Sequence, residues 1–243
     1  MSATVRIVAL LPLKAHSQRI PGKNFRPLAG KPLFRWTLDC LLSIQEISKV
    51  VINTDARAIL AHDGLRENAR LVIRDRRTEL CGDSVSMNLI LADDIEAYPA
   101  DVYVMTHTTN PLLKPETVRR ALSAFMNAKE QGVADSLFSV NRVQTRFYRV
   151  DGSAVNHDPK NLIRTQDLEP WFEESSTLYV FTTESFGTTD ARIGKTPIMF
   201  EIPKIESVDI DDASDWQIAE ALANHLYVNP HEPLGRMQAR KGN

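Results

Sequence analysis

Short apolar segments alternate with amphipathic ones along most of the chain. The first apolar segment, VRIVALLPL at residues 5–13, is nearly continuous, which is typical of a strand covered on both faces. Shorter segments of this kind predict further strands at residues 49–53, 71–73, 102–105 and 198–202. Apolar residues spaced three and four apart predict the intervening helices, which begin near Pro32, after Asp55, at Ser84, after Pro115 and at Ala213.

This order of elements predicts the fold class. Alternating strands and helices indicate an α/β fold of three layers, a mostly parallel sheet with helices on both faces. We expect a single domain over residues 1–243. The alternation stops at about residues 140–182, where extended pieces at 145–150 and 177–181 flank a polar stretch without helical periodicity. We interpret this stretch as an excursion from the sheet, either a lid or an arm that grips another subunit.

Composition narrows the functional classes. With 43% hydrophobic and 25% charged residues, the chain is typical of folded globular proteins. Cys40 and Cys81 are too few for a disulfide framework or a zinc site. No apolar run approaches the ~20 residues of a membrane helix, and the first residues do not resemble a secretion signal, so we expect a cytoplasmic protein. The net charge of −2 argues against a general nucleic-acid or membrane binder.

The charges are unevenly distributed. Residues 1–38 contain seven Lys or Arg side chains and no acidic residue, whereas residues 201–221 contain seven acidic side chains and a single cation, Lys204. The first segment is therefore suited to an anion, and the second to a cation.

The basic segment includes the loop SQRIPGKNFRPLAGKPL at residues 17–33, between the first strand and the first helix. In a parallel sheet, such a loop presents backbone N–H groups to an anion at the ligand-binding edge. Neither GxxxxGK[ST] nor GxGxxG is present, so a solvated, proline-stiffened loop would explain the composition equally well. The candidate donors to a polyphosphate are Lys14, Ser17, Gln18, Arg19 and Lys23.

The acidic segment contains SVDIDDASD at residues 207–215. Side chains alternate in an extended segment, so Asp209 and Asp211 point the same way, as two oxygen ligands of Mg²⁺ require. Asp212 and Asp215 have a simpler structural explanation, because they can cap the last helix and favour its positive end. A basic loop and paired carboxylates on one sheet edge together suggest metal-dependent chemistry on a nucleotide phosphate.

Two further stretches carry candidate substrate ligands. His107, in THTTNPLL at residues 106–113, follows a strand and could donate to a substrate oxygen, although a lone loop histidine is more often a surface residue. Arg164 could clamp a substrate carboxylate, but an ion pair with Asp167 or Glu169 explains it equally well.

The basic loop LPLKAHSQRIPGKNFRPLAGKPL resembles the signature LPARxxSKRIPxKNxxxLxGKPL of the acylneuraminate (CMP-sialic acid synthetase type) cytidylyltransferases. Further stretches are similar to that family in order and spacing: RRTELCGDSVSM, THTTNPLL, residues 164–179 and SVDIDDASDWQIAEAL. The resemblance implies a Rossmann-like nucleotidyltransferase fold and transfer of CMP from CTP to a nonulosonic (nine-carbon 2-keto) sugar acid, with release of pyrophosphate. It also implies that the excursion is a dimerisation arm of a homodimer or tetramer.

The resemblance also implies roles for individual residues. Those for the triphosphate are Lys14, Ser17, Gln18 and Lys23, with Arg19 in the same loop, and those around the cytidine are Asn24, Arg76 and Asp83. Those facing the sugar acid are His107, Arg164, Gln166 and Tyr179. Asp209 and Asp211 would bind Mg²⁺ or Mn²⁺, and the catalytic residues would be Lys14, Lys23 and Asp211, the last as proton acceptor.

Three positions depart from the family pattern. Lys14 replaces the usual Arg, Gln18 replaces a Lys and His107 replaces a Gln. These departures suggest a different nonulosonic acid or weakened catalysis. The alternatives are a cytidylyltransferase for Kdo or another sugar, and a non-catalytic CTP-binding homologue.

Overall fold

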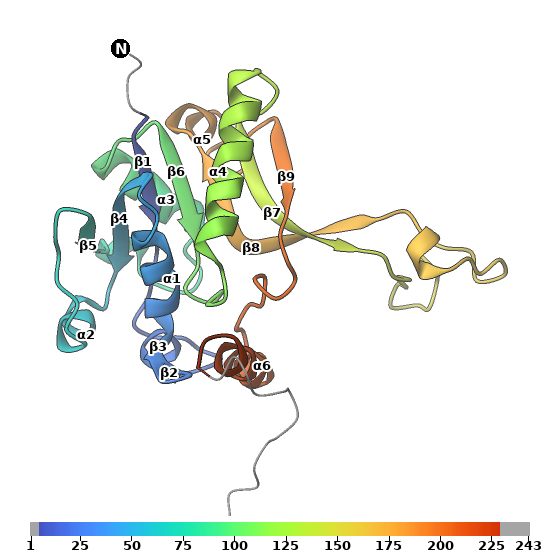
Figure 1. Ribbon diagram of the computed structural model, residues 1–243, viewed down its shortest axis with the longest axis horizontal. Coiled ribbons are helices and arrows are strands. Elements are labelled where there is room, and N and C mark those ends of the chain that lie inside the picture. The colour runs from blue at the N-terminus through green and yellow to red at the C-terminus, as the bar shows by residue number, and fades with distance from the viewer. Residues whose placement is uncertain (1–4, 229–243) are drawn as a thin grey trace, which may run out of the picture.

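Seven strands form one central sheet in the order β5-β4-β1-β6-β8-β7-β9 (Figure 1). The computed structural model describes residues 5–228. Only β8 runs antiparallel to its neighbours, so the sheet is mostly parallel, as predicted. The strands are β1 (Ile7–Leu10), β4 (Ile47–Thr54), β5 (Leu71–Asp75), β6 (Val102–Thr106), β7 (Ser136–Val143), β8 (Trp171–Phe181) and β9 (Pro197–Glu201), with a separate hairpin of β2 (Pro27–Leu28) and β3 (Lys31–Pro32).

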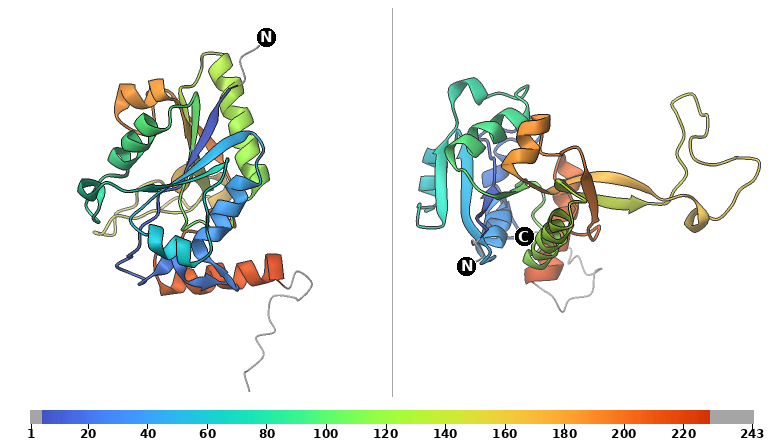
Figure 2. Two further views of the ribbon diagram at one scale, coloured as in Figure 1. Left: turned by 90° about the vertical axis from the view of Figure 1, so that its left-hand side faces the viewer. Right: turned by 90° about the horizontal axis from the view of Figure 1, so that it is seen from above.

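Helices cover both faces of this sheet (Figure 2). The helices are α1 (Leu33–Leu42), α2 (Arg57–His62), α3 (Met87–Ala97), α4 (Pro115–Glu130), α5 (Thr183–Thr189) and α6 (Ala213–Ala223). One core cluster packs α1, α2 and α4 against the sheet, and a second packs α3 and α5 against the opposite face. A third cluster joins α6 to α1 and the β2–β3 hairpin. The three-layer α/β prediction is therefore confirmed.

Local sequence explains where the main helices begin. In α4, Pro115 occupies the first turn, where its missing N–H needs no partner, and Val118, Ala121 and Phe125 form the buried stripe. Helix α3 begins three residues later than its predicted start at Ser84, because the Ser86 hydroxyl accepts a hydrogen bond from the Asn88 backbone and caps it.

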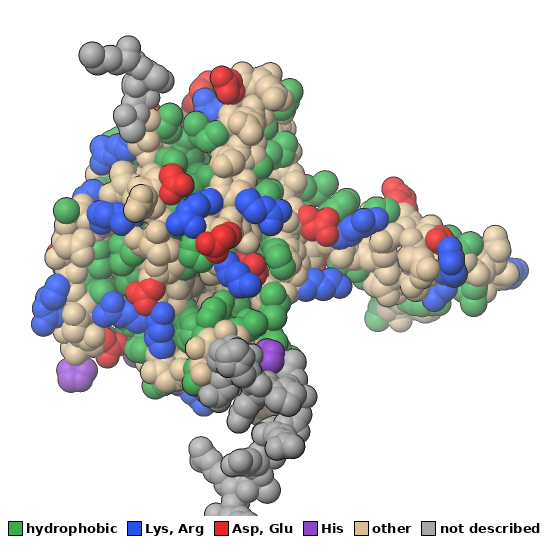
Figure 3. Space-filling model, in the orientation of Figure 1, with side chains coloured by type: hydrophobic (Ala, Val, Ile, Leu, Met, Phe, Trp, Pro, Cys, Tyr) green, Lys and Arg blue, Asp and Glu red, His purple; other side chains and the backbone are tan. Residues whose placement is uncertain are grey.

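Strands β7 and β8 continue beyond the sheet as a two-stranded arm, residues 141–173, which projects from the body in Figure 1 and in the right-hand view of Figure 2. Its paired part joins residues 141–143 to residues 171–173, and Phe147 stacks on Trp171 with the ring centroids 5.0 Å apart. The arm lies within the predicted excursion. Hydrophobic side chains lie along it (Figure 3). Among them, Val150 is fully exposed and Leu162 is largely exposed.

The predicted elements differ from the structure at three places. Residues 145–150 form no strand, because only one bridge, between Tyr148 and Ala154, occurs there. Strand β7 was not predicted, because its alternation of hydrophobic and polar residues is divided between sheet and arm. Helix α5 was not predicted either; it is a single short helix held by a capping box between Thr182 and Ser185. Within residues 5–228, no helix is both long and apolar enough to span a bilayer.

Candidate active site

A cavity of about 330 Å³ opens at the carboxyl end of β1, which pairs with β4 on one side and β6 on the other. The chain changes direction across the sheet here, and such a switch point is the usual ligand site of an open α/β sheet. The structure brings together around it residues that the sequence pattern placed in three separate motifs. The predicted residues lining the cavity are Lys14, Ser17, Gln18, Arg19, Lys23, Asn24, Arg76, Asp83 and His107.

The basic loop reaches the cavity through a tight turn. Gly22 has φ of 64°, in the left-handed region that glycine tolerates best, and the 3₁₀ turn Lys23–Phe25 follows directly. The Asn24 amide donates to the Lys14 carbonyl oxygen at 2.8 Å and accepts from the Thr108 hydroxyl at 2.7 Å. Asn24, predicted to contact cytidine, therefore also ties the loop to the segment after β6.

Asp83 contacts two side chains near the start of the basic loop. Its carboxylate pairs with the Lys14 ammonium and accepts from Gln18 Nε2 at 2.5 Å. The hydrogen bond from Lys14 is the main reason that the pKa of Asp83 lies below its usual value. Asp83 is thus paired with Lys14, the cation that the sequence motif assigned to phosphate. A polyphosphate would compete with this carboxylate for Lys14.

Lys23 lies at the base of the cavity and is only 8% exposed. Its ammonium donates to the Ile210 carbonyl oxygen and lies 4.0 Å from Asp211 Oδ1. Burial lowers the pKa of Lys23, and the negative charges of Asp211 and Asp209 oppose that shift. The predicted basic and acidic segments therefore meet at this lysine, 186 to 188 residues apart in the chain.

The two predicted metal ligands have different surroundings. Asp211 Oδ1 pairs with Arg19 Nη2 at 2.8 Å and is half-exposed. Asp209 is more buried, and its Oδ1 is buried without a hydrogen-bond partner. Burial raises the pKa of Asp209, against a stabilising hydrogen bond from Thr109.

These surroundings fit a hard divalent cation. Mg²⁺ in phosphate-transfer sites is held by one or two carboxylates, with the remaining positions filled by water and substrate phosphates. Asp209 offers an unpartnered carboxylate oxygen, and Asp211 lies two residues away on the same segment. In the described part of the chain, no group of three or more His, Cys, Asp or Glu could hold a metal by itself. A substrate would therefore have to complete the coordination.

The neighbouring carboxylates serve the helix, as predicted. The Asp212 side chain accepts from the Ser214 and Asp215 backbone N–H groups at 2.7 and 3.0 Å. Asp215 completes a capping box, and it also accepts from the Asp211 backbone N–H at 2.9 Å. The α6 cap thus fixes the main chain that carries Asp211.

Replacing Asp212 with alanine is expected to lower the free energy of unfolding by about 1 kcal/mol, because the α6 N-cap is lost. Turnover should persist, since Asp212 is exposed and points to the helix rather than the cavity. Urea denaturation and steady-state kinetics would measure the two effects. Ser214→Ala is the control for exposed substitutions in this turn, and a turnover loss in Asp212→Ala without a stability change would contradict the assignment.

His107 is held as a neutral imidazole. Burial, followed by the positive charges of Arg192 and Lys23, lowers its pKa to about 3. The side chain can therefore offer one N–H and one unprotonated nitrogen to a ligand at neutral pH, but no charge.

The depressed pKa of His107 predicts a pH effect on stability. Between pH 6.5 and pH 3 the unfolded chain binds a proton at this histidine that the folded chain excludes, so the free energy of unfolding falls as the pH falls. His107→Gln is expected to reduce that fall, as measured by urea denaturation at pH 7 and pH 4.5. His62→Gln, an exposed histidine, is the matched control and should leave the fall unchanged. An equal pH dependence in wild type and His107→Gln would contradict the prediction.

The predicted sugar-facing residues do not all meet. Tyr179 is buried on β8, and its hydroxyl donates to Glu174 at 2.6 Å and accepts from Arg192 at 3.0 Å. Arg164 and Gln166 lie on the arm, where Arg164 forms the alternative ion pair with Asp167 at 2.7 Å. Within one subunit, the structure does not bring these arm residues to the cavity.

The sequence analysis missed Arg192. Its guanidinium lies 3.9 Å from the centroid of the Tyr179 ring and contributes to the electrostatics of His107. Arg192 and Glu174 line a second hollow, and Met87 lines both this hollow and the main cavity. No motif marks Arg192, because its contact with Tyr179 is made only in the folded chain.

Comparison with known proteins shows matches over most of the chain. The family model described as cytidylyltransferase matches residues 8–227. The CMP-N,N'-diacetyllegionaminic acid synthase of Legionella pneumophila is 27% identical, over 90% of this chain and 96% of its own length. The pseudaminic acid cytidylyltransferase of Campylobacter jejuni is 24% identical, over 90% and 97%.

Other matches extend this comparison. The N-acylneuraminate cytidylyltransferase A of Danio rerio is 30% identical over 88% of this chain, which spans only 50% of that protein. Among solved structures, a CMP:2-keto-3-deoxy-manno-octonic acid synthetase complexed with CTP superposes with a TM-score of 0.62 at 14% identity, covering 91% of this chain and 99% of that one. At that identity, the structural match supports the fold alone.

Proposed function

Because the chain belongs to the cytidylyltransferase family, we propose that it transfers CMP from CTP to a hydroxyl of a nonulosonic sugar acid and releases pyrophosphate. The observation that carries this proposal is the cavity at the end of β1, where Lys23 of the basic loop meets the Asp209–Asp211 segment. The relatives covered over nearly their full length are named for legionaminic and pseudaminic acids, which favours this class of acceptor.

The basic loop binds the triphosphate. Arg19 and Lys23 face the cavity beside Asp211, and Lys14 lies at its entrance. Their positive charges stabilise the pyrophosphate as it leaves, which is where negative charge accumulates during phosphoryl transfer. Gln18 in place of a second cation lowers the charge of the loop and is compatible with slower turnover.

Asp209 and Asp211 would hold Mg²⁺ or Mn²⁺, and the ion would neutralise negative charge at the α-phosphate. Asp211 also accepts the proton of the attacking hydroxyl, because its half-exposed carboxylate can approach a bound acceptor.

The acceptor binds beside the nucleotide, towards the hollow that contains Arg192 and Glu174. Arg192 can present a guanidinium to an oxygen of the sugar acid, and neutral His107 can form one directional hydrogen bond. The arm, with its exposed apolar side chains, joins a second subunit and carries Arg164 and Gln166 to the partner's cavity. The working form is therefore a homodimer, or a tetramer of two such pairs, and sedimentation would measure its mass.

The decisive experiment is pyrophosphate release with CTP, Mg²⁺ and a panel of sialic, legionaminic and pseudaminic acids and Kdo. Pyrophosphate is expected with at least one nine-carbon acid, and only with CTP among the nucleoside triphosphates. Turnover with Kdo alone would favour the alternative acceptor. Binding of CTP without turnover on any acid would instead support the non-catalytic homologue.

A further inference from the structure

Arg76, which lines the nucleotide cavity, is held from behind by an asparagine. Arg76 Nε donates to Asn53 Oδ1 at 2.8 Å, and its Nη2 donates to the Asn53 carbonyl oxygen at 2.9 Å. Asn53, on β4, is fully buried. Its Nδ2 donates to Asp94 Oδ1, on α3, at 2.7 Å. A hydrogen-bonded chain thus runs from a buried carboxylate through Asn53 to the cavity.

Asp94 sets the orientation of the Asn53 amide. A carboxylate only accepts hydrogen bonds, so it selects the rotamer in which Asn53 turns its NH₂ group towards α3. The amide oxygen then faces Arg76, which only donates. With no acceptor at position 94, the asparagine could flip and present its NH₂ group to the guanidinium, and the two donors would repel.

Burial of Asp94 is more unfavourable energetically than a purely structural role would explain. It is fully buried, and its Oδ2 has no hydrogen-bond partner. Burial raises its pKa to about 6, against the hydrogen bonds from Asn53 and Arg74. A buried carboxylate with an unsatisfied oxygen is destabilising unless something else requires it there.

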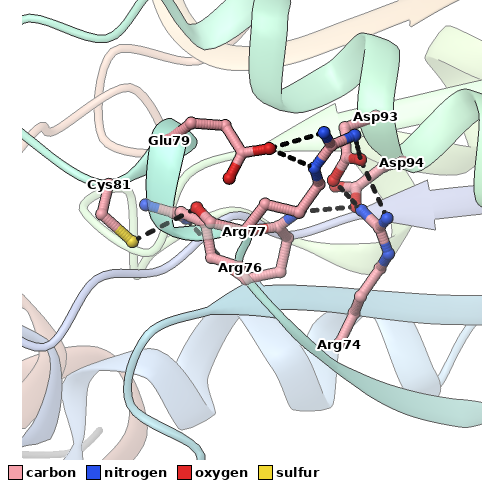
Figure 4. Close-up of polar contacts among 8 residues, drawn as sticks. Arg74, Arg76, Arg77, Glu79, Cys81, Asp93 and Asp94 are labelled. Carbon is pink, nitrogen blue, oxygen red and sulfur yellow. Dashed lines mark hydrogen bonds and ion pairs between the residues drawn. The ribbon is translucent and has the colours of Figure 1, made fainter.

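The adjacent Asp93 provides a comparison within the same cluster. Figure 4 shows Arg74 pointing towards both carboxylates, and Arg77 reaching Asp93. Asp93 accepts from Arg74 Nη2 at 2.9 Å, whereas the side-chain hydrogen bonds of Asn53 go to Asp94 and Arg76. Both aspartates therefore neutralise Arg74, but only Asp94 continues the chain to Arg76.

We propose that Asp94 is a positioning residue, which fixes Arg76 for CTP through the Asn53 amide. The inference rests on the proposed function and concerns the same cavity. It follows that the group required at position 94 is a hydrogen-bond acceptor at Oδ1, not a negative charge.

The test is the Kd of the full chain for CTP, measured by calorimetry in the absence of the sugar acid. Asp94→Leu removes the acceptor and should raise the Kd about tenfold, the typical effect of losing one hydrogen bond to a charged group. Asp94→Asn keeps an oxygen facing Asn53 and should stay within about twofold of wild type. Asp93→Leu, the matched control, should also leave the Kd within about twofold. At saturating CTP, kcat and the KM for the sugar acid should not change in any of these variants.

A double-mutant cycle separates positioning from general stability. In an Arg76→Ala background, Asp94→Leu should cause no further rise in Kd, because the residue it positions is gone. If Asp94→Leu does not fold, Asn53→Leu cuts the same chain and replaces it in the cycle.

Three results would overturn the inference while CTP still binds to the wild type: equal loss in Asp93→Leu and Asp94→Leu, loss in Asp94→Asn as large as in Asp94→Leu, or an undiminished effect without Arg76. A wild-type protein that does not bind CTP at all would overturn the proposed function as well, so the two failures are distinguishable.

Discussion

Replacing Asp211 with asparagine is expected to lower kcat for CMP transfer by on the order of 10²–10³-fold, the range seen when one preorganised electrostatic group is removed from a transition state. The carboxylate is proposed both to hold the divalent ion with Asp209 and to accept the proton of the attacking hydroxyl. Asparagine is nearly the same size but carries no charge and does not accept a proton. The melting temperature should be unchanged, because the Asp211 backbone N–H remains held by Asp215.

Asp212→Asn is the matched control for this variant. It removes one negative charge from the adjacent residue, but asparagine caps a helix as well as aspartate does. Its kcat should therefore stay close to that of the wild type. A titration of turnover with Mg²⁺ adds a second measurement, in which Asp211→Asn should need more of the ion for half-maximal rate. Wild-type kcat in Asp211→Asn, or an equal loss in Asp212→Asn, would contradict both roles of Asp211.

Much of the fold is predictable because the signals are local. Each buried parallel strand is a short apolar run, and each covering helix has its own stripe, as in α4. Strand β7 was not predicted because its first five residues are mostly buried in the sheet, whereas its last three, on the arm, are partly buried or exposed. Helix α5 was not predicted because a seven-residue helix is too short to show a hydrophobic period.

The residues of the site also differ in whether local sequence predicts their contacts. The proximity of Lys23 and Asp211 was predictable, because each lies in its own motif and parallel topology carries the loop and the acidic segment to one sheet edge. The contacts of Arg192, Asn53 and Asp94 were not predictable, because they depend on partners distant in sequence; Asn53 and Asp94, for example, are 41 positions apart. The capping role of Asp212 was predictable because an N-cap is a contact within four residues.

The family resemblance adds what local physics lacks. Residue types alone reached only metal-dependent chemistry on a nucleotide phosphate, whereas the match over residues 8–227 confirms the cytidylyltransferase family. The structure then adds a constraint that neither the motifs nor the family match contained. Lys14, which we propose to bind phosphate, is paired with Asp83, so phosphate binding by Lys14 would require an exchange of partners at the start of the loop.

The second large effect is expected at Lys23. Lys23→Ala should lower kcat/KM for CTP by on the order of 10²–10³-fold, because it removes a buried cation that faces the phosphates from the base of the cavity. A charge in this partly desolvated place is screened less by water than the exposed charge of Arg19, so its loss should cost more. The loss should remain at saturating Mg²⁺, because an ion held by Asp209 and Asp211 would not replace the ammonium of Lys23.

Two further variants give this prediction its sharpness. Lys31→Ala, the matched control, removes a lysine of the same loop that pairs with Asp39 and lies over Trp36, outside the residues lining the cavity. Its kcat/KM should be close to wild type. Lys23→Arg keeps the charge but places a larger, planar group against the Ile210 carbonyl, so it should recover only part of the activity. Equal losses in Lys23→Ala and Lys31→Ala would mean that the loop acts through its total charge, whereas a loss confined to Lys23→Ala would assign the effect to the buried ammonium beside Asp211.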